Sequence, residues 1–399
     1  KLSASFERGH QFRIAFTLKG NFAKDTIRKP PPKNVVRLSK SQLEASAKNK
    51  EIFYRSLNRS LRDESIYIQA ANLDIDEVDV SIASTKYFSL TRAAGRTARV
   101  VSALTPDSVD RINIHAMNGD FQVSSISIDR KEFDLADKYL GSPVELLEKS
   151  ELISTSNKPL YLDSEYKPTV FFPEFEWNMS PSLRHQIGGP EGFYLGQLLW
   201  KTDTSIKFKR NLALYSSFGI SIYDTFDDLR NPSGSTIPHV RSDIQEYLEQ
   251  GKNHIQRMQL EYFSSPYKDV FTRLDIGILE EMFGGFGGEI LYRPFNKKWA
   301  TGVSIHRVRQ RDFNQLFKFR KYEATTGHLG FYYDFPYGIN SQFLVGQYLA
   351  GDKGATLDLS RRFKSGFTLG VFATKTNLSS EEFGEGSFDK GFYISVPTK

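Results

Sequence analysis

The sequence of 399 residues contains no cysteine, which excludes disulfide bonds, thiolate metal ligands and a catalytic thiol. It also has no run of about 20 apolar residues, the length that a membrane-spanning helix requires. Hydrophobic residues make up 39% of the chain and the mean hydropathy is −0.43. These values leave a membrane β-barrel open, because the strands of a barrel alternate apolar and polar side chains.

The charge balance is mildly basic, with 53 Lys and Arg residues against 47 Asp and Glu residues. The formal net charge of +6 indicates a weak preference for acidic partners and is poor evidence for nucleic acid, which we do not expect as a partner. The chain starts at Lys1, without a methionine, a signal peptide or a lipid-bearing cysteine. We therefore expect a mature or trimmed part of a longer protein.

Residues 1–22 have the pattern of a β-hairpin. Phe12, Ile14 and Phe16 alternate with shorter or polar residues, as in a half-buried strand. We expect these two strands to complete a structure that begins upstream. The prolines at 30–32 follow and indicate a stiff, extended linker.

Residues 35–150 contain an internal repeat of one helix and two strands. The expected elements are helices near 43–61 and 89–104 and strands near 65–72, 77–84, 109–118 and 121–130. One pattern recurs at a constant offset, in which Ile66, Ile68, Ala70, Asn72 and Asp74 match Ile112, Ile114, Ala116, Asn118 and Asp120. The sequence therefore predicts a small α+β module of two copies of one unit, a type of module that often serves as a docking surface.

Residues 165–399 show the alternation of an antiparallel transmembrane β-barrel. About twelve strands are expected from this period-two pattern. They lie near 167–178, 191–207, 212–225, 255–264, 270–281, 287–294, 299–309, 322–335, 339–349, 354–363, 366–376 and 389–397. Aromatic residues make up 14% of the chain, and several of them flank the expected turns, where a barrel places its aromatic girdle.

The connections between these strands alternate between tight turns and longer polar loops. Tight turns are expected at 209–211, 296–298, 336–338 and 364–365, and longer loops at 180–190, 227–253, 310–321 and 377–388. The glycine-rich run at 284–288 lacks the Lys-Ser/Thr pair of a phosphate loop. We expect it to form a tight turn between strands, because glycine tolerates the necessary backbone angles.

Alternation also assigns side chains to the two faces of the expected sheet. Leu274 and Ile276 share one face, and Arg273 and Asp275 share the other, because successive side chains of a strand point to opposite sides. The polar face is expected to carry Arg273, Asp275, Glu289, Arg293, His306 and Asp358. These residues either contact a glycan that passes through the lumen or form ordinary ion pairs that fill and stiffen the barrel.

No pattern in the chain favours catalysis or metal binding. The seven histidines are scattered, so we predict no metal site and no cofactor. A catalytic serine needs a base within reach, and nothing favours one serine over its neighbours. The adjacent Glu280 and Glu281 would point to opposite faces of a strand and therefore do not form an acid/base pair. We predict no catalytic residue and no enzyme activity.

Five ordered sequence blocks carry a resemblance to a known family. They are VRSD at 240–243, LEEMFGGFGGEILYRP at 279–294, QRDF at 310–313, QYLAGDKGAT at 347–356 and FGEGSFDKGF at 383–392. The region 180–399 resembles the YjbH/GfcD family of bacterial exopolysaccharide and group 4 capsule outer-membrane proteins. The resemblance implies an outer-membrane β-barrel, usually of a lipoprotein, that is needed to secrete an exopolysaccharide or a capsule.

Members of that family resemble two barrel halves with a periplasmic module between them. The resemblance therefore implies that residues 1–22 are the terminal hairpin of an upstream barrel, that 35–150 lie in the periplasm, and that 165–399 form the second barrel. The implied partners are outer-membrane lipid, the exopolysaccharide or capsule glycan, and periplasmic export proteins of the same system.

The function expected from the sequence is polysaccharide secretion at the bacterial outer membrane. The polar lumen or groove of the barrel would conduct a hydrated chain passively, and the module would dock periplasmic partners. Two alternatives stay open. One is an outer-membrane barrel enzyme that acts on lipid or glycan, and the other is a soluble, β-rich glycan-binding protein.

Overall fold

The computed structural model describes residues 2–7, 11–16, 35–84, 86–87, 89–119, 121–154, 163–189, 192–226, 238–241, 243–363, 366–379, 382 and 389–395. The chain divides into two compact units, residues 1–36 and residues 37–399. In the first unit, β1 (Leu2–Glu7) and β2 (Gln11–Phe16) pair antiparallel, with Leu2 opposite Phe16. That this hairpin ends an upstream barrel stays a prediction.

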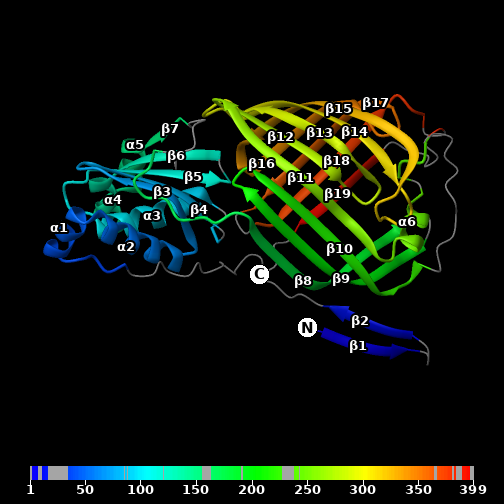
Figure 1. The fold of residues 1–399 in the computed structure, drawn as a ribbon, viewed down its shortest axis with the longest axis horizontal. Helices are drawn as coiled ribbons and strands as arrows, with labels where there is room; N and C mark the ends of the chain where they lie inside the picture. The colour runs from blue at the N-terminus through cyan, green and yellow to red at the C-terminus, as the bar shows by residue number, and fades with distance from the viewer. Residues whose placement is uncertain are drawn as a thin grey trace. The chain divides into compact units, whose positions relative to one another are not determined.

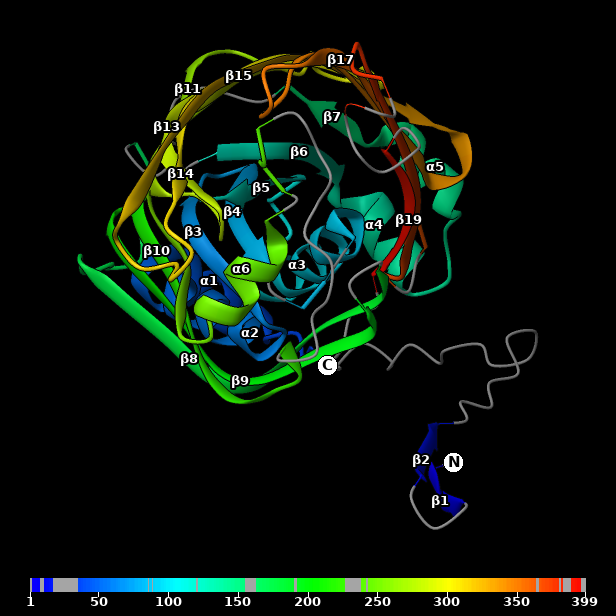
Figure 2. The same ribbon diagram turned by 90° about the vertical axis from the view of Figure 1, so that its right-hand side faces the viewer.

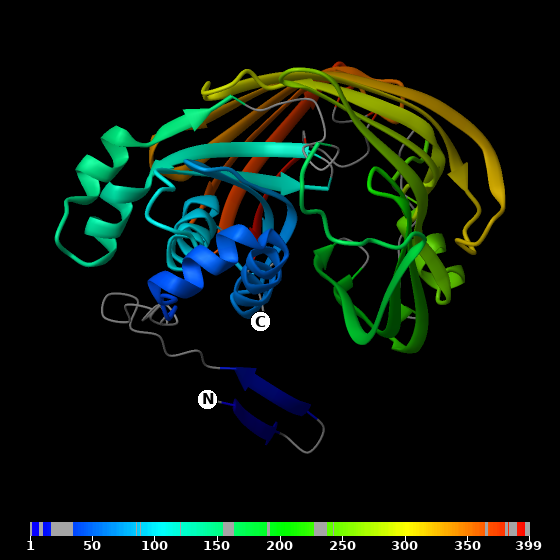
Figure 3. The same cartoon turned by 60° about the vertical axis from the view of Figure 1, so that its left-hand side comes forward.

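The second unit begins with an α+β region that we call the module, residues 37–154 (Figure 1). Its elements are α1 (Lys40–Lys48), α2 (Lys50–Asp63), β3 (Ile66–Leu73), β4 (Glu77–Ser84), α3 (Leu90–Leu104), β5 (Arg111–Asn118), β6 (Phe121–Asp129), α4 (Arg130–Asp137), α5 (Pro143–Lys149) and β7 (Glu151–Ile153). The strands form one sheet in the order β3-β4-β5-β6-β7, in which β4 and β5 are parallel and the other neighbours are antiparallel. Figure 3 shows the α1–α3 helices gathered on one side of these strands.

The internal repeat corresponds to two helix–hairpin units. The repeated Ile-x-Ile-x-Ala pattern falls on β3 and β5, and helices α2 and α3 precede the two hairpins. Ser39 begins α1 with a capping box, in which its side chain and that of Gln42 satisfy each other's backbone N–H groups. The single helix expected near 43–61 is wrong in one respect, because α1 ends at Lys48 and α2 starts afresh after Asn49. Asp120, the last matched position, lies outside the described residues.

The module has an ordinary hydrophobic core between its helices and its sheet. Leu57 and Leu61 of α2 are fully buried, as are Ile66 of β3 and Ile112 of β5. Burial of each such side chain contributes roughly 1.5–3 kcal/mol relative to exposure. This packing, rather than helix propensity, holds α2 and α3 in place.

A second, larger sheet follows the module. Its strands are β8 (Glu174–Gly189), β9 (Gly192–Lys209), β10 (Leu212–Asp224), β11 (His254–Tyr267), β12 (Val270–Ile278), β13 (Phe283–Tyr292), β14 (Trp299–Arg311), β15 (Phe319–Phe335), β16 (Ile339–Gln347), β17 (Lys353–Arg362), β18 (Thr368–Thr376) and β19 (Asp389–Ser395). All neighbours are antiparallel and follow chain order from β8 to β19, which makes 12 strands. Within the described residues no helix is both long and apolar enough to span a membrane.

The described strands of the large sheet do not form the closed barrel that the sequence predicts. Closure requires the first and last strands to pair with a matching tilt and stagger. In the described part of the chain β8 and β19 are instead the two free edges of an open sheet. Figure 2 shows that the sheet curves strongly from β8 round to β19.

The connections confirm the expected alternation only in part. Tight connections join β9 to β10, β11 to β12 and β15 to β16, and a long segment that contains α6 (Ile244–Gln250) joins β10 to β11. The long loop expected at 180–190 is wrong, because β8 continues to Gly189 and β9 starts at Gly192. We call the end of the sheet with the tight connections the turn end, and the opposite end, which carries α6, the loop end.

The glycine-rich run at 284–288 lies inside β13, so the tight turn expected there is wrong. The chain reverses before it, at 279–282. The glycines instead allow neighbouring groups to approach closely. A Cβ atom on Gly285 would lie 2.1 Å from the carbonyl oxygen of Arg307, and one on Gly287 would lie 2.3 Å from the ring of His306.

Candidate functional site

The two faces of the large sheet differ in chemistry. The outer face is the one that carries Leu274 and Ile305, whose side chains are 58% and 57% exposed. The inner face carries Asp275 and His306, and the helix α6 packs on it next to Val308. Alternation along the strands, expected from the sequence, produces this separation.

Four of the six predicted polar residues come together on the inner face. The Nε atom of Arg273 lies 3.6 Å from Asp275 Oδ2 and 3.4 Å from Glu289 Oε1, and His306 Nε2 lies 3.2 Å from Asp275 Oδ2. We call these four residues the inner charge network. Because Asp275 is only 5% exposed, its charge depends on Arg273 and His306 for compensation.

A glycine makes this network possible. Asp275 of β12 pairs with Gly287 of β13, which in turn pairs with His306 of β14. Since Gly287 has no side chain, the His306 ring lies across β13 and reaches the carboxylate two strands away. The sequence suggests the polar residues but not this contact, because pairing register follows from the fold.

The other two predicted residues lie elsewhere. Arg293 follows the end of β13 at the turn end of the sheet, where it lines a cavity together with Glu289. Asp358 is on β17 and accepts a hydrogen bond of 3.0 Å from the hydroxyl of Tyr393. The structure therefore does not combine all six into one site.

A second cluster, for which the sequence indicates no role, lies at the loop end of the sheet. Its apolar centre contains Tyr247 of α6 together with Met282, Phe283, Val308 and Ala324 from the sheet and its turns. We call this cluster and the polar groups bound to it the loop cap. It gives this end of the large sheet a packed core of the ordinary kind.

Arg311 is the central polar residue of the loop cap and is completely buried. Its guanidinium donates hydrogen bonds to five backbone carbonyls, which belong to Ile255, Glu280, Glu281, Gln315 and Leu316. These carbonyls come from two connections of the sheet and from the start of β11. One side chain therefore joins the loop that follows β14 to the turn before β13 and to the start of β11.

Two further buried groups complete this arrangement. The hydroxyl of Tyr247 donates to the carbonyl of Arg311 at 2.7 Å, and the amide of Gln315 donates to the carbonyl of Tyr247 at 2.6 Å. Burial raises the pKa of Tyr247 to about 12, so this hydroxyl remains a donor well into the alkaline range. These hydrogen bonds hold α6 and the loop after β14 together.

Four of the five sequence blocks meet at or next to the loop cap. Residues 240–241 and 243, 279–283, 310–313 and 347–352 all lie at this end of the sheet. Arg241 pairs with Glu280 at 2.8 Å, Gln310 donates to the carbonyl of His239, and Leu349 packs against the apolar centre. The fifth block, 383–392, is described only at 389–392. The blocks were thus a usable signal, but a sequence pattern alone does not indicate which residues contact each other.

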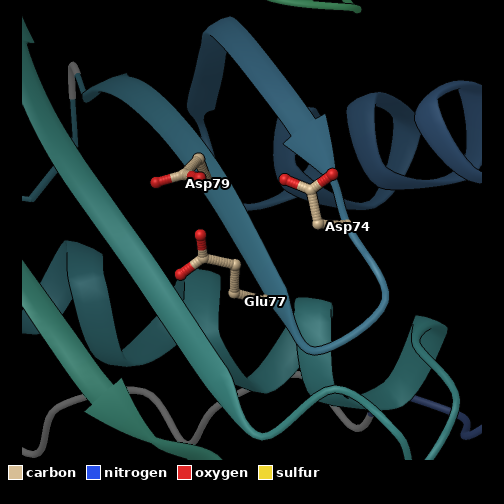
Figure 4. A group of neighbouring side chains, drawn as sticks. All are labelled: Asp74, Glu77 and Asp79. Carbon is tan, nitrogen blue, oxygen red and sulfur yellow. The ribbon is translucent and has the colours of Figure 1, made fainter.

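Three acidic residues form a small cluster in the module (Figure 4). Oxygen atoms of Asp74, Glu77 and Asp79 lie within 4.8 Å of one another, near the turn between β3 and β4. Two of the three are already engaged, because Asn113 donates to Glu77 at 3.0 Å and His115 Nε2 lies 3.1 Å from Asp79. These contacts account for Glu77 and Asp79 as polar residues of the sheet surface, without the need for a bound cation.

Comparison with known proteins identifies the family. The YjbH family, described as exopolysaccharide biosynthesis protein YbjH, matches residues 1–399. The chain belongs to the YjbH family. It is 32% identical to the "Uncharacterized lipoprotein YjbH" of Escherichia coli strain K12 over 99% of its own length. The chain spans 57% of that relative, so it corresponds to a little more than half of the curated protein. The family resemblance predicted from the sequence blocks is therefore confirmed.

Proposed function

We propose that this chain is part of an outer-membrane protein that takes part in the secretion of an exopolysaccharide or capsule glycan. The observation that carries the proposal is the contrast between the two faces of the large sheet. Its outer face exposes apolar side chains, and its inner face bears buried or half-buried charges. A sheet in water has the opposite arrangement, because its exposed face is polar.

The outer face suits contact with hydrocarbon. Leu274, Phe286, Val303, Ile305 and Leu329 are each between 45% and 58% exposed on neighbouring strands. An apolar surface of this extent is unusual on a soluble monomer and marks an interaction surface. Lipid is the partner that we propose for it.

Aromatic pairs at the turn end support the same orientation. Tyr292 contacts Trp299 with ring centroids 5.9 Å apart, and Tyr333 contacts Phe335 at 4.7 Å. Membrane barrels place such rings at the level of the lipid headgroups. We therefore propose that the turn end faces the periplasm and the loop cap faces outward.

The inner face suits a hydrated glycan. The inner charge network offers hydrogen-bond donors and acceptors, and its two carboxylates already have Arg273 or His306 as partners, so that it would not trap a passing chain. We propose a passive path of this kind, along the inner face and past the loop cap. Arg273, Asp275, Glu289 and His306 are the proposed contacts.

The two free edges require partners in a membrane. Unpaired backbone groups of β8 and β19 would each cost several kcal/mol in hydrocarbon, so a spanning sheet has to be closed. We propose that further strands of the whole protein pair with these edges, as the family resemblance implies for a protein with two barrel halves. The proposal extends to lipidation of the whole protein, because the relative in Escherichia coli is described as a lipoprotein.

The module is the proposed docking element in the periplasm. Its helix α5 and strand β7 expose apolar side chains, among them Leu147 and Leu152. We propose periplasmic export proteins of the same system as its partners. An enzymatic role on lipid or glycan is the alternative, and it predicts hydrolysis by the pure protein that is lost on mutation of one inner-face residue.

Spin labels test the proposal directly. Labels at Leu274, Val303, Leu357 and Leu369 of the protein in lipid bilayers should be relaxed by oxygen dissolved in the acyl chains and not by aqueous nickel. Labels at the inner positions Ser304 and Thr356 serve as the matched controls and should respond to nickel. The reverse pattern would exclude a lipid-facing outer surface.

A secretion assay tests the biological part of the proposal. In a host that lacks its own family member, the full-length protein should restore exopolysaccharide to the culture medium. Retention of the polymer in the periplasm despite correct membrane insertion would exclude a role in secretion. Hydrolysis of the polymer by the pure protein would favour the enzyme instead.

A further inference from the structure

A cavity of about 420 Å³ opens near the turn end of the sheet, between β13, β14 and β15. It lies apart from the loop cap and next to the inner charge network, with which it shares Glu289. The residues that define its chemistry are Leu291, Arg293, Lys297, Lys298, Tyr332 and Leu344. Its size suits one or two sugar rings rather than a large ligand.

The cavity faces the inner side of the sheet. Leu291, Gly302 and Gly330 are direct neighbours in register, and this row alternates with the inner row of Glu289, Ser304 and His328 on the same face. The outer residues Ile290 and Val303 point away from this face. The cavity is therefore placed on the path that we propose for a glycan and not against lipid.

Two paired glycines create the hollow. Gly302 of β14 lies opposite Gly330 of β15, so that two adjacent inner positions have no side chain. A Cβ atom on Gly330 would lie 3.0 Å from the hydroxyl of Tyr332 and 3.1 Å from Cε2 of the same ring. The Tyr332 ring therefore leans across the glycine and forms part of the floor, with Leu291 and Leu344 beside it.

The charges around the cavity are unbalanced. Among the described residues, Arg293, Lys297 and Lys298 make no ion pair. The two carboxylates of the lining are already engaged, since Glu289 pairs with Arg273 at 3.4 Å and Asp334 accepts a hydrogen bond from Asn340. Three free cations above an aromatic floor form a site for an anion that is attached to an apolar ring face.

We propose that this cavity binds one acidic sugar unit of the glycan. The carboxylate or other anionic group of the sugar contacts Arg293, Lys297 and Lys298, and the C–H face of the ring lies on Tyr332. This inference rests on the proposed function and makes it more specific, because it assigns the exported polymer to the acidic glycans. The site is a point of selection at the periplasmic entrance of the path.

Titration calorimetry on the full-length protein in neutral detergent tests the assignment. The probes are tetragalacturonate, which is acidic, and maltotetraose, which is neutral. We expect binding of tetragalacturonate only, with an affinity that falls as salt is added. The double variant K297Q/K298Q should bind at least about tenfold more weakly, the effect of losing one charge-assisted contact.

Matched variants separate the site from a general charge effect. K268Q removes a cation from the neighbouring β11–β12 turn and should leave the affinity unchanged. Tyr332→Ala should weaken binding by about tenfold and Tyr332→Phe should not, because the ring face and not the hydroxyl carries the contact. Circular dichroism of each variant establishes that it is folded.

The possible outcomes distinguish this inference from the function on which it rests. Equal binding of both probes, or equal weakening by K268Q and K297Q/K298Q, would overturn the acidic-sugar site and leave secretion intact. Binding of phosphatidylglycerol vesicles that K297Q/K298Q abolishes, without binding of tetragalacturonate, would reassign the cations to lipid. Failure of the wild-type protein to restore secretion would overturn the proposed function itself, whatever the binding result.

Discussion

The module and the large sheet use the same period-two alternation but direct it to opposite environments. In the module, Val78 and Val80 of β4 are completely buried under helices. In the large sheet, Leu274 and Phe286 are both 58% exposed on the outer face, whereas Asp275 of the inner face is 5% exposed. The comparison shows that alternation fixes which residues share a face and that the surroundings decide which face is apolar.

The loop cap is the part of the large sheet that resembles the module, because it has a buried core. It buries Tyr247, Phe283 and Arg311 as a soluble core would. The module contains a counterpart in Arg130, a buried arginine whose guanidinium donates to the carbonyls of Ser102, Thr105, Pro106 and Val109 around the end of α3. In both places one arginine satisfies carbonyls that a chain reversal leaves without partners.

The largest expected effect comes from removal of the arginine in the loop cap. Arg311→Leu removes one donor from each of five backbone carbonyls, and we expect a loss of about 3–5 kcal/mol because a buried acceptor that is left unsatisfied costs about 1–3 kcal/mol. Thermal unfolding in detergent and trypsin cleavage of the 225–253 loop measure this loss. Arg309→Leu, an exposed position on the same strand, is the control. Equal stability of the two variants would show that the loop cap does not depend on these bonds.

The next effect distinguishes the surroundings of the two regions. Leu274→Arg should destabilise the sheet in lipid bilayers by about 2–4 kcal/mol, the cost of an arginine near the middle of a bilayer. Leu147→Arg on the exposed surface of α5 should change stability by less than about 0.5 kcal/mol. Urea unfolding of both variants in bilayers gives the comparison. A tolerant Leu274 would mean that the outer face does not meet hydrocarbon.

Much of the large sheet could be predicted from the sequence because alternation is a local property. Eleven of the twelve strands lie near their expected positions, whereas β8 runs from Glu174 to Gly189 instead of 167–178. The faces of Arg273, Asp275, Leu274 and Ile276 follow from parity. Closure could not be predicted, since it depends on whether the first and last strands pair. The tight turn expected at 284–288 is wrong because glycine occurs both in turns and where strands approach closely. The contacts of Gly285 and Gly287 with the neighbouring strand distinguish the two cases, and they are known only from the structure.

The candidate site was only partly accessible to sequence reasoning. Polar residues on one face could be recognised, but the contact between Asp275 and His306 passes over Gly287 and depends on a register across three strands. Arg311 belongs to the QRDF block, but its role could not be predicted, because a buried arginine cannot be distinguished from an exposed one by sequence. Its role follows from two connections and the start of β11, which meet in space.

A smaller effect is expected from the glycine beneath the inner charge network. Gly287→Ala places a Cβ atom 2.3 Å from the His306 ring, so the ring has to move away from Asp275. We expect a loss of about 1–3 kcal/mol, as is typical of overpacking. The double variant Gly287→Ala/His306→Ala removes the clash with the ring but keeps the Cβ atom 2.5 Å from the carbonyl oxygen of Ile305, so it should recover only part of this loss. No recovery at all would show that the ring is not what the added methyl group strains. Thermal unfolding in detergent measures both.

The smallest expected effect is a pH response confined to the contact between the module and the segment that carries Glu165 and Tyr166. Glu165 accepts hydrogen bonds from Lys50 and Tyr54. The next residue, Tyr166, forms a β-bridge with Ala71. Burial of Glu165 opposes its ionisation, but the bonds from Lys50 and Tyr54 outweigh it and hold the pKa of Glu165 below its ordinary value. Burial, and then the bond to Glu165, raises the pKa of Tyr54, so that the phenol stays a donor.

The sign of this response follows from the lowered pKa of Glu165. Its stabilisation is present above the ordinary glutamate pKa of about 4.3 and is lost as the pH falls through the lower value of the folded state. The amide protection factors of Ala71 and Tyr166 should therefore fall below about pH 4 in the wild type. In Glu165→Gln they should already be lower at pH 7 and change less with pH. The same acid dependence in the wild type and in Glu165→Gln would assign the response to another carboxylate. The large sheet does not share these contacts, so the spin-label accessibilities of its residues should stay constant over this pH range.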